Sequence, residues 1–476
     1  MTTPGATTLR TGARTGGQAR ARTTARTVAG EVRGGREEGV TVFRGVPYAA
    51  PARRFTEPAP PVPWKGVRDM RAFGPPAAQR PGRMAWVPGL EIDPAAGREN
   101  CLTLNVWTPG LPEPGAGPRP VLVFLHGGAF VSGSGAQPMY RGDALARDHG
   151  LVVVTVNYRL GVLGFGYDDT IPANLGLRDQ VAALEWVRDN IAAFGGDPGQ
   201  VTLAGHSAGG TSVLALMAAP AAQGLFARAA ALSPLPYGFA TPQKARALTG
   251  AFRRALGRAL PRSAPLRAVL DAEADALLTR PPVEGVLPIA PVVDGEFLPR
   301  HPMDAVRSGT AARVPLLVTT TAEEMRLFAA LDPENLSRAA VRTEVVFERP
   351  VAELVRWHRE HGAHVRRHQF GHRSPLVRAG VALGAAHLVD VPFYLGTLHD
   401  RRVAPLTGTG PDATRLGHRA TRALAAFCSG AGDLALIDDN LAGPASAAPA
   451  HDGKEGRPCR TRSASRSSDR ATSAPT

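Results

Sequence analysis

Cysteine is scarce in this chain, which has only three among its 476 residues, namely Cys101, Cys428 and Cys459. Three cysteines cannot form the disulfide framework of a small secreted domain, and these lie too far apart in sequence for metal-ligand spacing. We therefore expect three free thiols and no bound metal. Cys101 lies in an apolar run, which predicts a small buried core residue.

Long apolar runs are also lacking. The strongest of them, residues 151–156, is far shorter than a membrane-crossing helix needs. The N-terminus has no apolar stretch that resembles the core of a secretion signal. Aromatic residues make up only 6% of the chain, but hydrophobic residues reach 43%, which is enough for a large buried core. We therefore expect a cytoplasmic globular protein with no membrane span.

Acidic residues are few where the basic ones gather. Residues 1–30 hold five arginines and no acid, and residues 451–476 carry a net charge of +3, so the long middle part accounts for only +6 of the net +14. The Thr, Ser, Gly, Ala and Pro content of both ends cannot bury enough apolar surface to fold. The charge therefore predicts disordered tails, residues 1–27 and 436–476, rather than a nucleic-acid-binding arm. We expect no nucleic-acid partner.

The most informative segment present is residues 201–217. An apolar run leads into Gly-x-Ser-x-Gly, with Ser207 at its centre, and then into a helix-like run. Strand, sharp turn and helix are the context of a nucleophile elbow. Gly205 and Gly209 stand two residues on either side of Ser207, where a side chain would collide with the returning backbone. Ser207 is therefore the candidate nucleophile, although so loose a motif also occurs by chance at ordinary strand-to-helix turns.

The rest of the chain predicts an α/β sheet covered by helices, because strand, helix and elbow strand follow one another as a βαβ unit. Strands are predicted at residues 40–43, 98–107, 121–125, 151–156 and 314–319. Helices are predicted from Asp179 to Phe194, within residues 241–285 and 351–372, and from about His418 to Phe427. Glu323 and Glu324 come just after a strand, and sites in open α/β sheets gather beyond the carboxyl ends of strands.

Taken together, these motifs resemble the type-B carboxylesterase family of α/β-hydrolases, which also contains the cholinesterases. The likeness rests on residues 43–49, 99–106, 126–130, 157–161, 174–180, 194–198 and 205–209. The motifs appear in the family's order over residues 28–235, and beyond them the likeness thins to residues 315–328 and 384–393. The resemblance implies an α/β-hydrolase domain over residues 28–435. It also implies hydrolysis of small to medium carboxylic esters through an acyl-enzyme, with no metal or organic cofactor.

The resemblance also implies a catalytic triad of Ser207, Glu324 and His387. The histidine would take the serine proton and return it to the leaving alcohol, while the glutamate orients the imidazole. The usual glycine after the acid is Met325 here, so Glu323 remains an alternative acid. The alternative bases are His372 and His399.

Supporting residues follow from the same resemblance. The expected oxyanion donors are the backbone N–H groups of Gly127, Gly128 and Ala208, because paired glycines let the backbone approach a ligand closely. Ser233 matches a family serine that supports the acid, although an ordinary serine at a strand end would look the same.

Three departures from the family pattern limit this interpretation. His206 stands where the family usually has Glu, which favours neutral esters over cationic choline esters. Asn100 replaces the usual Asp, and Cys101 has no upstream cysteine, so we expect no disulfide to tie down residues 79–98. The family also contains catalytically silent binding proteins, and this is the alternative function. Retention of all three triad residues argues against it.

Overall fold

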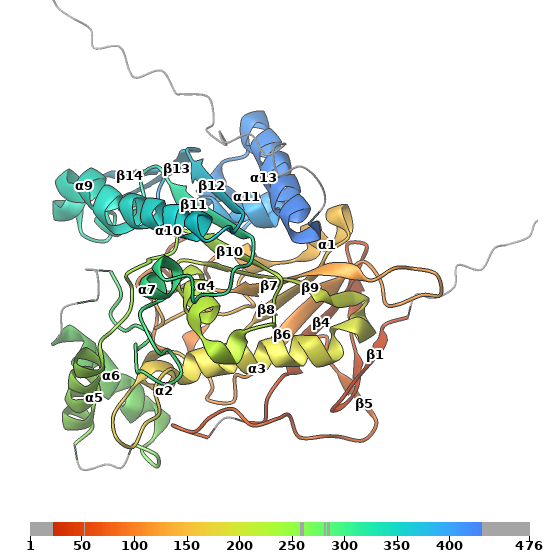
Figure 1. Ribbon diagram of the computed structural model, residues 1–476, viewed down its shortest axis with the longest axis horizontal. Coiled ribbons are helices and arrows are strands. Elements are labelled where there is room, and N and C mark those ends of the chain that lie inside the picture. The colour runs from red at the N-terminus through yellow and green to blue at the C-terminus, as the bar shows by residue number, and fades with distance from the viewer. Residues whose placement is uncertain (1–21, 52, 258–260, 280–281, 283–285, 431–476) are drawn as a thin grey trace, which may run out of the picture. The chain divides into compact units, whose positions relative to one another are not determined.

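The computed structural model describes residues 22–51, 53–257, 261–279, 282 and 286–430 of the protein. Within these residues, nine strands form one large sheet (Figure 1). Their spatial order is β12 (Val365–Phe370), β11 (Leu316–Thr321), β10 (Arg228–Leu232), β9 (Gly196–His206), β7 (Arg119–Leu125), β8 (Val152–Val156), β6 (Thr103–Thr108), β4 (Val40–Pro47) and β3 (Gly35–Glu37). From β12 to β8 the neighbours are parallel, and from β8 to β3 they are antiparallel.

Smaller sheets lie beside the large one. β1 (Thr24–Thr27), β2 (Gly30–Arg33) and β5 (Val67–Asp69) form one, and β13 (Ser374–Arg378) pairs with β14 (Val381–Gly384). The assignment of residues 24–27 to a disordered tail is wrong, because β1 pairs with β2 and buries Ala25 and Thr27. The remainder of the predicted tails, with Cys459, falls outside the described residues.

Helices cover both faces of the sheet (Figure 1). On one face, α3 (Leu175–Asn190) contacts β9, and α4 (Ala208–Ala218) contacts β7, β9 and β10; on the other, α1 (Asp143–His149) contacts β6 and β8, and α13 (Pro411–Ser429) contacts β7 and β9. The other helices are α2 (Gly161–Phe165), α5 (Pro242–Leu256), α6 (Leu266–Leu278), α7 (Pro302–Arg307), α8 (Arg326–Ala329), α9 (Ala339–Thr343), α10 (Arg349–Glu360), α11 (Val391–Leu395) and α12 (Ala404–Thr407). Short turns of helix complete the set at η1 (Pro94–Ala96), η2 (Pro138–Tyr140), η3 (Ile191–Phe194), η4 (Pro220–Ala222), η5 (Pro333–Arg338), η6 (Glu344–Glu348) and η7 (Thr397–His399).

Strand β7 shows how one apolar run supplies two cores. Side chains alternate between the faces of a strand. Val121, Val123 and Leu125 pack in the cluster that includes residues of α3 and α4. Leu122 and Phe124 pack in the cluster that includes residues of α1 and α13. The predicted architecture, a mostly parallel sheet with helices on both faces, is confirmed.

Several predicted elements have different bounds. The strand predicted at residues 98–107 begins only at Thr103. The helix predicted to open at Asp179 begins at Leu175, and Asp179 is instead buried within it, where Nε and Nη2 of Arg159 donate to its carboxylate at 2.7 and 2.6 Å. Residues 351–372 are not one helix. They contain most of α10 and the edge strand β12, because Val365 to Phe370 pair with β11.

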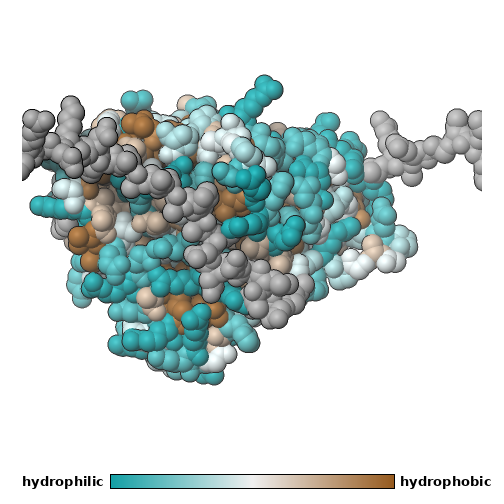
Figure 2. Space-filling model, turned by 90° about the horizontal axis from the view of Figure 1, so that it is seen from above, coloured by the Kyte–Doolittle hydropathy of each residue, from teal (hydrophilic) through white to brown (hydrophobic). Residues whose placement is uncertain are grey.

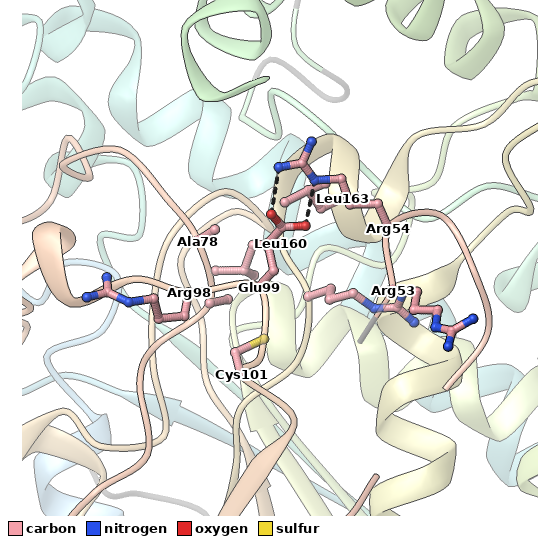
Figure 3. A pocket seen from close by; sticks show the side chains of 10 residues that line it. Arg53, Arg54, Ala78, Arg98, Glu99, Cys101, Leu160 and Leu163 are labelled. Carbon is pink, nitrogen blue, oxygen red and sulfur yellow. Dashed lines mark hydrogen bonds and ion pairs between the residues drawn. The ribbon is translucent and has the colours of Figure 1, made fainter. Parts of the chain in front are cut away.

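Cys101 lies beside the pocket drawn in Figure 3. Its thiol is buried and free, as predicted, and burial raises its pKa to about 12. Cys428 is also buried and free. Beside Cys101, Glu99 accepts hydrogen bonds from Nε and Nη2 of Arg54, both at 2.6 Å. An ion pair, rather than a disulfide, therefore links the chain just before Cys101 to the segment around Arg54.

No helix of the described residues is long and apolar enough to cross a membrane. Figure 2 shows one face of the protein, on which hydrophobic residues lie in small separate areas among hydrophilic ones.

Glu273 on α6 has a buried carboxyl group, which accepts one hydrogen bond from the neighbouring helix α2. Its Oε2 accepts the N–H of Val162 at 2.8 Å, and Gly161, with φ 57°, leaves the room that a Cβ would occupy. Burial raises the pKa of Glu273 to about 7. The folded protein therefore binds this proton more tightly than the unfolded chain, and this contribution to stability is lost as the pH rises toward 7.

We expect Glu273→Gln to remove this pH dependence. Glutamine keeps an acceptor for Val162 but cannot ionise, so the variant should match the wild type near pH 4 and exceed its stability at pH 8 by up to about 3 kcal/mol. Calorimetric unfolding of both proteins at the two pH values measures this difference. A stability difference that is the same at both pH values would contradict the assignment.

Candidate active site

Ser207 forms the sharp turn between β9 and α4. Its φ of 57° and ψ of −119° are rare for a residue other than glycine, and such strain is common at active sites. A Cβ on Gly205 would collide with the backbone of Gly209, and one on Gly209 would collide with the carbonyl oxygen of Leu125. Both positions therefore require glycine, as the sequence predicts. The turn has the geometry of a nucleophile elbow.

His387 and Glu324 lie together although 63 residues separate them in the chain. Nδ1 of His387 is 2.6 Å from Oε2 of Glu324, and the backbone N–H of His387 donates to the Glu324 carbonyl oxygen at 3.2 Å. The other carboxylate oxygen of Glu324 accepts the N–H of Thr321 at 2.7 Å. Both side chains are buried. The carboxylate is therefore held in place by the end of β11 while it binds the imidazole.

The alternative acid and bases have other partners. Glu323 pairs with Arg373 at 2.6 Å and accepts the N–H of Ala385 at 2.8 Å. His372 is 2.8 Å from the carbonyl oxygen of Thr407. His399 contacts Asp143 at the start of α1. The hydrogen bond to this carboxylate is the main cause that raises the pKa of His399. These three side chains are therefore engaged in contacts that hold the fold together.

The second ring nitrogen of His387 faces no protein partner. Nε2 is buried and has no hydrogen bond within the described residues, including none to Ser207. The ring is packed by His206, Phe347 and Phe328, whose centroids lie 4.7, 5.3 and 5.6 Å away. Catalytic hydrogen bonds are often long in the absence of substrate and shorten when substrate binds. Nε2 is thus left as the nitrogen that can exchange a proton with a reacting group.

The Gly127 N–H, one of the predicted oxyanion donors, has a hydrogen-bond partner within the protein. This N–H donates to the hydroxyl of Tyr140 at 3.3 Å, so it is already engaged within the protein. Gly127 has a different use. A Cβ at this position would stand 3.2 Å from Cβ of Ser207 and 3.1 Å from Nδ1 of His206, so the glycine lets the backbone pass close to the elbow.

Gly128 and the following residue offer the free donors instead. Among the described residues, the N–H groups of Gly128 and Ala129 have no hydrogen-bond partner. Gly128 has φ 119°, and a Cβ there would collide with the carbonyl of Ser132, so only glycine fits. Ala208 is the first residue of α4, where a backbone N–H has no partner within the helix. Sequence reasoning missed Ala129, because its Cβ gives no signal of an exposed backbone.

Comparisons with known proteins show which family the chain belongs to. The sequence pattern of the carboxylesterase family matches residues 21–342. The para-nitrobenzyl esterase of Bacillus subtilis (strain 168) is 38% identical over 342 residues, which are 68% of each chain. The chain belongs to the carboxylesterase family.

Further relatives support the same assignment. Phenmedipham hydrolase of Pseudarthrobacter oxydans is 36% identical over 431 residues, covering 80% of this carboxylesterase and 85% of the relative. A crystal structure of a Geobacillus stearothermophilus carboxylesterase at pH 6.2 matches with a TM-score of 0.75 at 33% identity, over 86% and 91% of the two chains. The predicted α/β-hydrolase fold is therefore confirmed. The protein is a serine carboxylesterase, and these comparisons do not favour the alternative of a silent binding protein.

Ser233 of the carboxylesterase follows β10, the strand next to β11. It is fully buried with φ 44°, and its N–H donates to the carbonyl oxygen of Thr319 at 2.9 Å. Its Oγ has no partner within the described residues, so the structure contains no direct bond from Ser233 to Glu324. The predicted support of the acid by Ser233 stays a prediction.

Asp390 is a residue that sequence reasoning missed. It is fully buried, accepts a hydrogen bond from Oγ1 of Thr319 at 3.2 Å, and has no partner for Oδ1 in the described structure. Burial raises the pKa of Asp390 to about 7, and the charge of Glu324 adds to the rise. Asp390 therefore lies in the electrostatic field of Glu324 and His387. The sequence signal that could have identified Asp390 was its position three residues after His387, within the family-like residues 384–393.

Proposed function

We propose that this carboxylesterase hydrolyses neutral esters of small to medium size through an acyl-enzyme on Ser207. His387 is the proposed general base and Glu324 the acid that orients it. The observation that carries this proposal is the 2.6 Å contact between Nδ1 of His387 and Oε2 of Glu324, beside a serine with elbow geometry. The carboxylate favours the tautomer with the proton on Nδ1. Nε2 then keeps its lone pair for the proton of Ser207.

In the proposed acylation step, Oγ of Ser207 attacks the ester carbonyl while Nε2 of His387 takes its proton. Hydrogen bonds from the N–H groups of Gly128, Ala129 and Ala208 would stabilise the negative charge that develops on the carbonyl oxygen. Loss of one such donor typically costs about 3 kcal/mol in the transition state. The imidazolium then returns its proton to the leaving alcohol, which leaves the acyl group on Ser207. Water reverses the sequence and releases the carboxylic acid.

An active-site serine probe tests this proposal. A fluorophosphonate should label the protein once, and peptide mapping should find the label on Ser207. Deletion of both arginine-rich ends should leave the labelling unchanged, because the proposed site needs neither end. A label on another serine, or no label on active enzyme, would contradict the proposal.

Organisation and location are also proposals. We propose a single catalytic domain that begins at or before β1 and ends near the end of α13, with arginine-rich tails on either side. A cytoplasmic location and the absence of a nucleic-acid partner and of a cofactor remain predictions. A small-molecule ester is the proposed partner of the site.

The preference for neutral esters is proposed from His206. Its imidazole is 3% exposed, and burial, together with the nearby His387, lowers the pKa of His206 well below its ordinary value. The residue is therefore uncharged at neutral pH, where the family usually has an anion. Two charges about 4 Å apart interact by roughly 4 kcal/mol at an effective dielectric constant of 20.

We expect the wild type to prefer a butyryl ester of a neutral alcohol over butyrylcholine. In His206→Glu the ratio of the two kcat/KM values should fall by about tenfold or more, because the carboxylate would attract the cationic head group. Steady-state kinetics of both esters with both proteins measure this ratio. A wild type that favours the choline ester, or a ratio that does not move, would show that His206 does not contact the alcohol side of the substrate.

A further inference from the structure

His206 is a buried polar side chain whose hydrogen-bonding capacity is unused. It is only 3% exposed, and neither Nδ1 nor Nε2 has a hydrogen-bond partner among the described residues. A neutral imidazole carries one donor and one acceptor. Leaving such groups without hydrogen bonds in the interior destabilises the folded protein. A residue next to the nucleophile that carries this cost has the groups needed to bind a small polar molecule.

The position of His206 indicates which molecule this is. Its Nδ1 lies 3.1 Å from the point where a Cβ on Gly127 would stand, and that point is 3.2 Å from Cβ of Ser207. On the other side, the centroid of the His387 ring lies 4.7 Å from that of His206, with 40° between the ring planes. Nε2 of His387 also lacks a hydrogen-bond partner among the described residues. Two imidazoles with unmet nitrogens therefore lie side by side next to the elbow.

We propose that His206 and His387 together hold the water that hydrolyses the acyl-enzyme. The inference rests on the proposed acylation of Ser207. Water has two O–H groups, so two acceptors fix its orientation and turn its lone pairs toward the acyl carbon. Nε2 of His387 accepts one O–H group and a ring nitrogen of His206 accepts the other. Burial keeps the His206 imidazole neutral, so one of its ring nitrogens can accept a hydrogen bond.

In the chemical step, His387 is the only histidine that takes up and returns a proton. The water oxygen bonds to the acyl carbon as one water proton moves to Nε2 of His387. The bond between the acyl carbon and Oγ of Ser207 breaks, and Oγ takes the proton back from His387. The products are the carboxylic acid and free Ser207. His206 exchanges no proton in this scheme, so it is a positioning residue.

This role of His206 affects the rate of deacylation but not the rate of acylation. During acylation the leaving alcohol, rather than water, interacts with His387, so acylation does not depend on the acceptor of His206. Methanol can replace water as the attacking molecule, but it has only one O–H group, which His387 accepts. Loss of the acceptor on His206 should therefore slow hydrolysis more than transfer of the acyl group to methanol.

The test compares His206→Phe with His206→Gln, using p-nitrophenyl butyrate in buffer with added methanol. Phenylalanine removes the acceptor, whereas glutamine keeps one. We expect the ratio of methyl butyrate to butyric acid to rise about fivefold or more in His206→Phe and less than twofold in His206→Gln. The rate constant of the pre-steady-state release of p-nitrophenolate, which reports acylation, should stay within about threefold of the wild type in both variants.

His358→Phe is a matched control, because it replaces a buried histidine on α10 whose Nε2 is bonded to the Val314 carbonyl oxygen, outside the proposed site. Its product ratio should equal that of the wild type. An unchanged ratio in His206→Phe, or the same rise in His206→Gln, would overturn the inference while butyryl-Ser207 is still found by peptide mapping. If no variant carries butyryl on Ser207, the proposed function itself fails.

Discussion

Replacing Ser207 with alanine is expected to lower kcat/KM for p-nitrophenyl butyrate by at least about 10⁴-fold. Without the hydroxyl there is no acyl-enzyme, and only the oxyanion donors and substrate binding are left to accelerate the reaction. The melting temperature should change little, because alanine keeps Cβ in the same backbone conformation and loses one hydroxyl group. Kinetics and calorimetry of the same preparations measure both effects.

A second serine makes this experiment specific. Ser212 on α4 is also buried, and its Oγ is the acceptor for Nε2 of Gln180 at 3.2 Å, so Ser212→Ala removes a hydroxyl five residues from the elbow. We expect this control to keep most of the activity. Turnover of Ser207→Ala comparable to that of the wild type would remove Ser207 from the mechanism.

The second large effect is expected for the acid. Glu324→Gln should lower kcat by about 10³-fold or more, because a glutamine can turn its NH₂ group toward Nδ1 and so stabilise the wrong tautomer of His387. Glu323→Gln should lower kcat by less than about tenfold, because Glu323 holds Arg373 and the N–H of Ala385 rather than the base. Steady-state kinetics of the two variants give the comparison.

The neighbouring carboxylates serve as controls for each other. Both changes remove one negative charge from adjacent positions, so a general electrostatic effect would lower kcat in both variants alike. A larger loss in Glu323→Gln than in Glu324→Gln would mean that the acid lies one residue earlier than proposed.

The features that are local in sequence were the ones that could be predicted. The elbow is an example, because Gly205 and Gly209 are needed by backbone contacts within a few residues of Ser207 and with the adjacent strand. The apolar runs at residues 121–125 and 151–156 likewise fall in β7 and β8, since a strand buried on both faces needs a continuous apolar run.

Features that depend on distant partners could not be read from one segment. The Gly127 N–H looks free until Tyr140 is brought beside it, and residues 365–370 look helical until β11 provides a pairing partner. Nine histidines follow Glu324 in the sequence, and residue type alone does not separate them. Only the resemblance to a family singled out His387. In the structure the reason is physical, because the loop after β14 and the loop after β11 meet there.

Trapping of the acyl group tests whether esters are hydrolysed through a covalent intermediate on Ser207. The enzyme is mixed with excess p-nitrophenyl butyrate, quenched with acid within milliseconds, digested and mapped by mass spectrometry. We expect one butyryl group on the peptide that contains Ser207, present at early times and lost once the substrate is consumed. Active enzyme that carries no butyryl group at any time, or carries it on another residue, would contradict a covalent mechanism through Ser207.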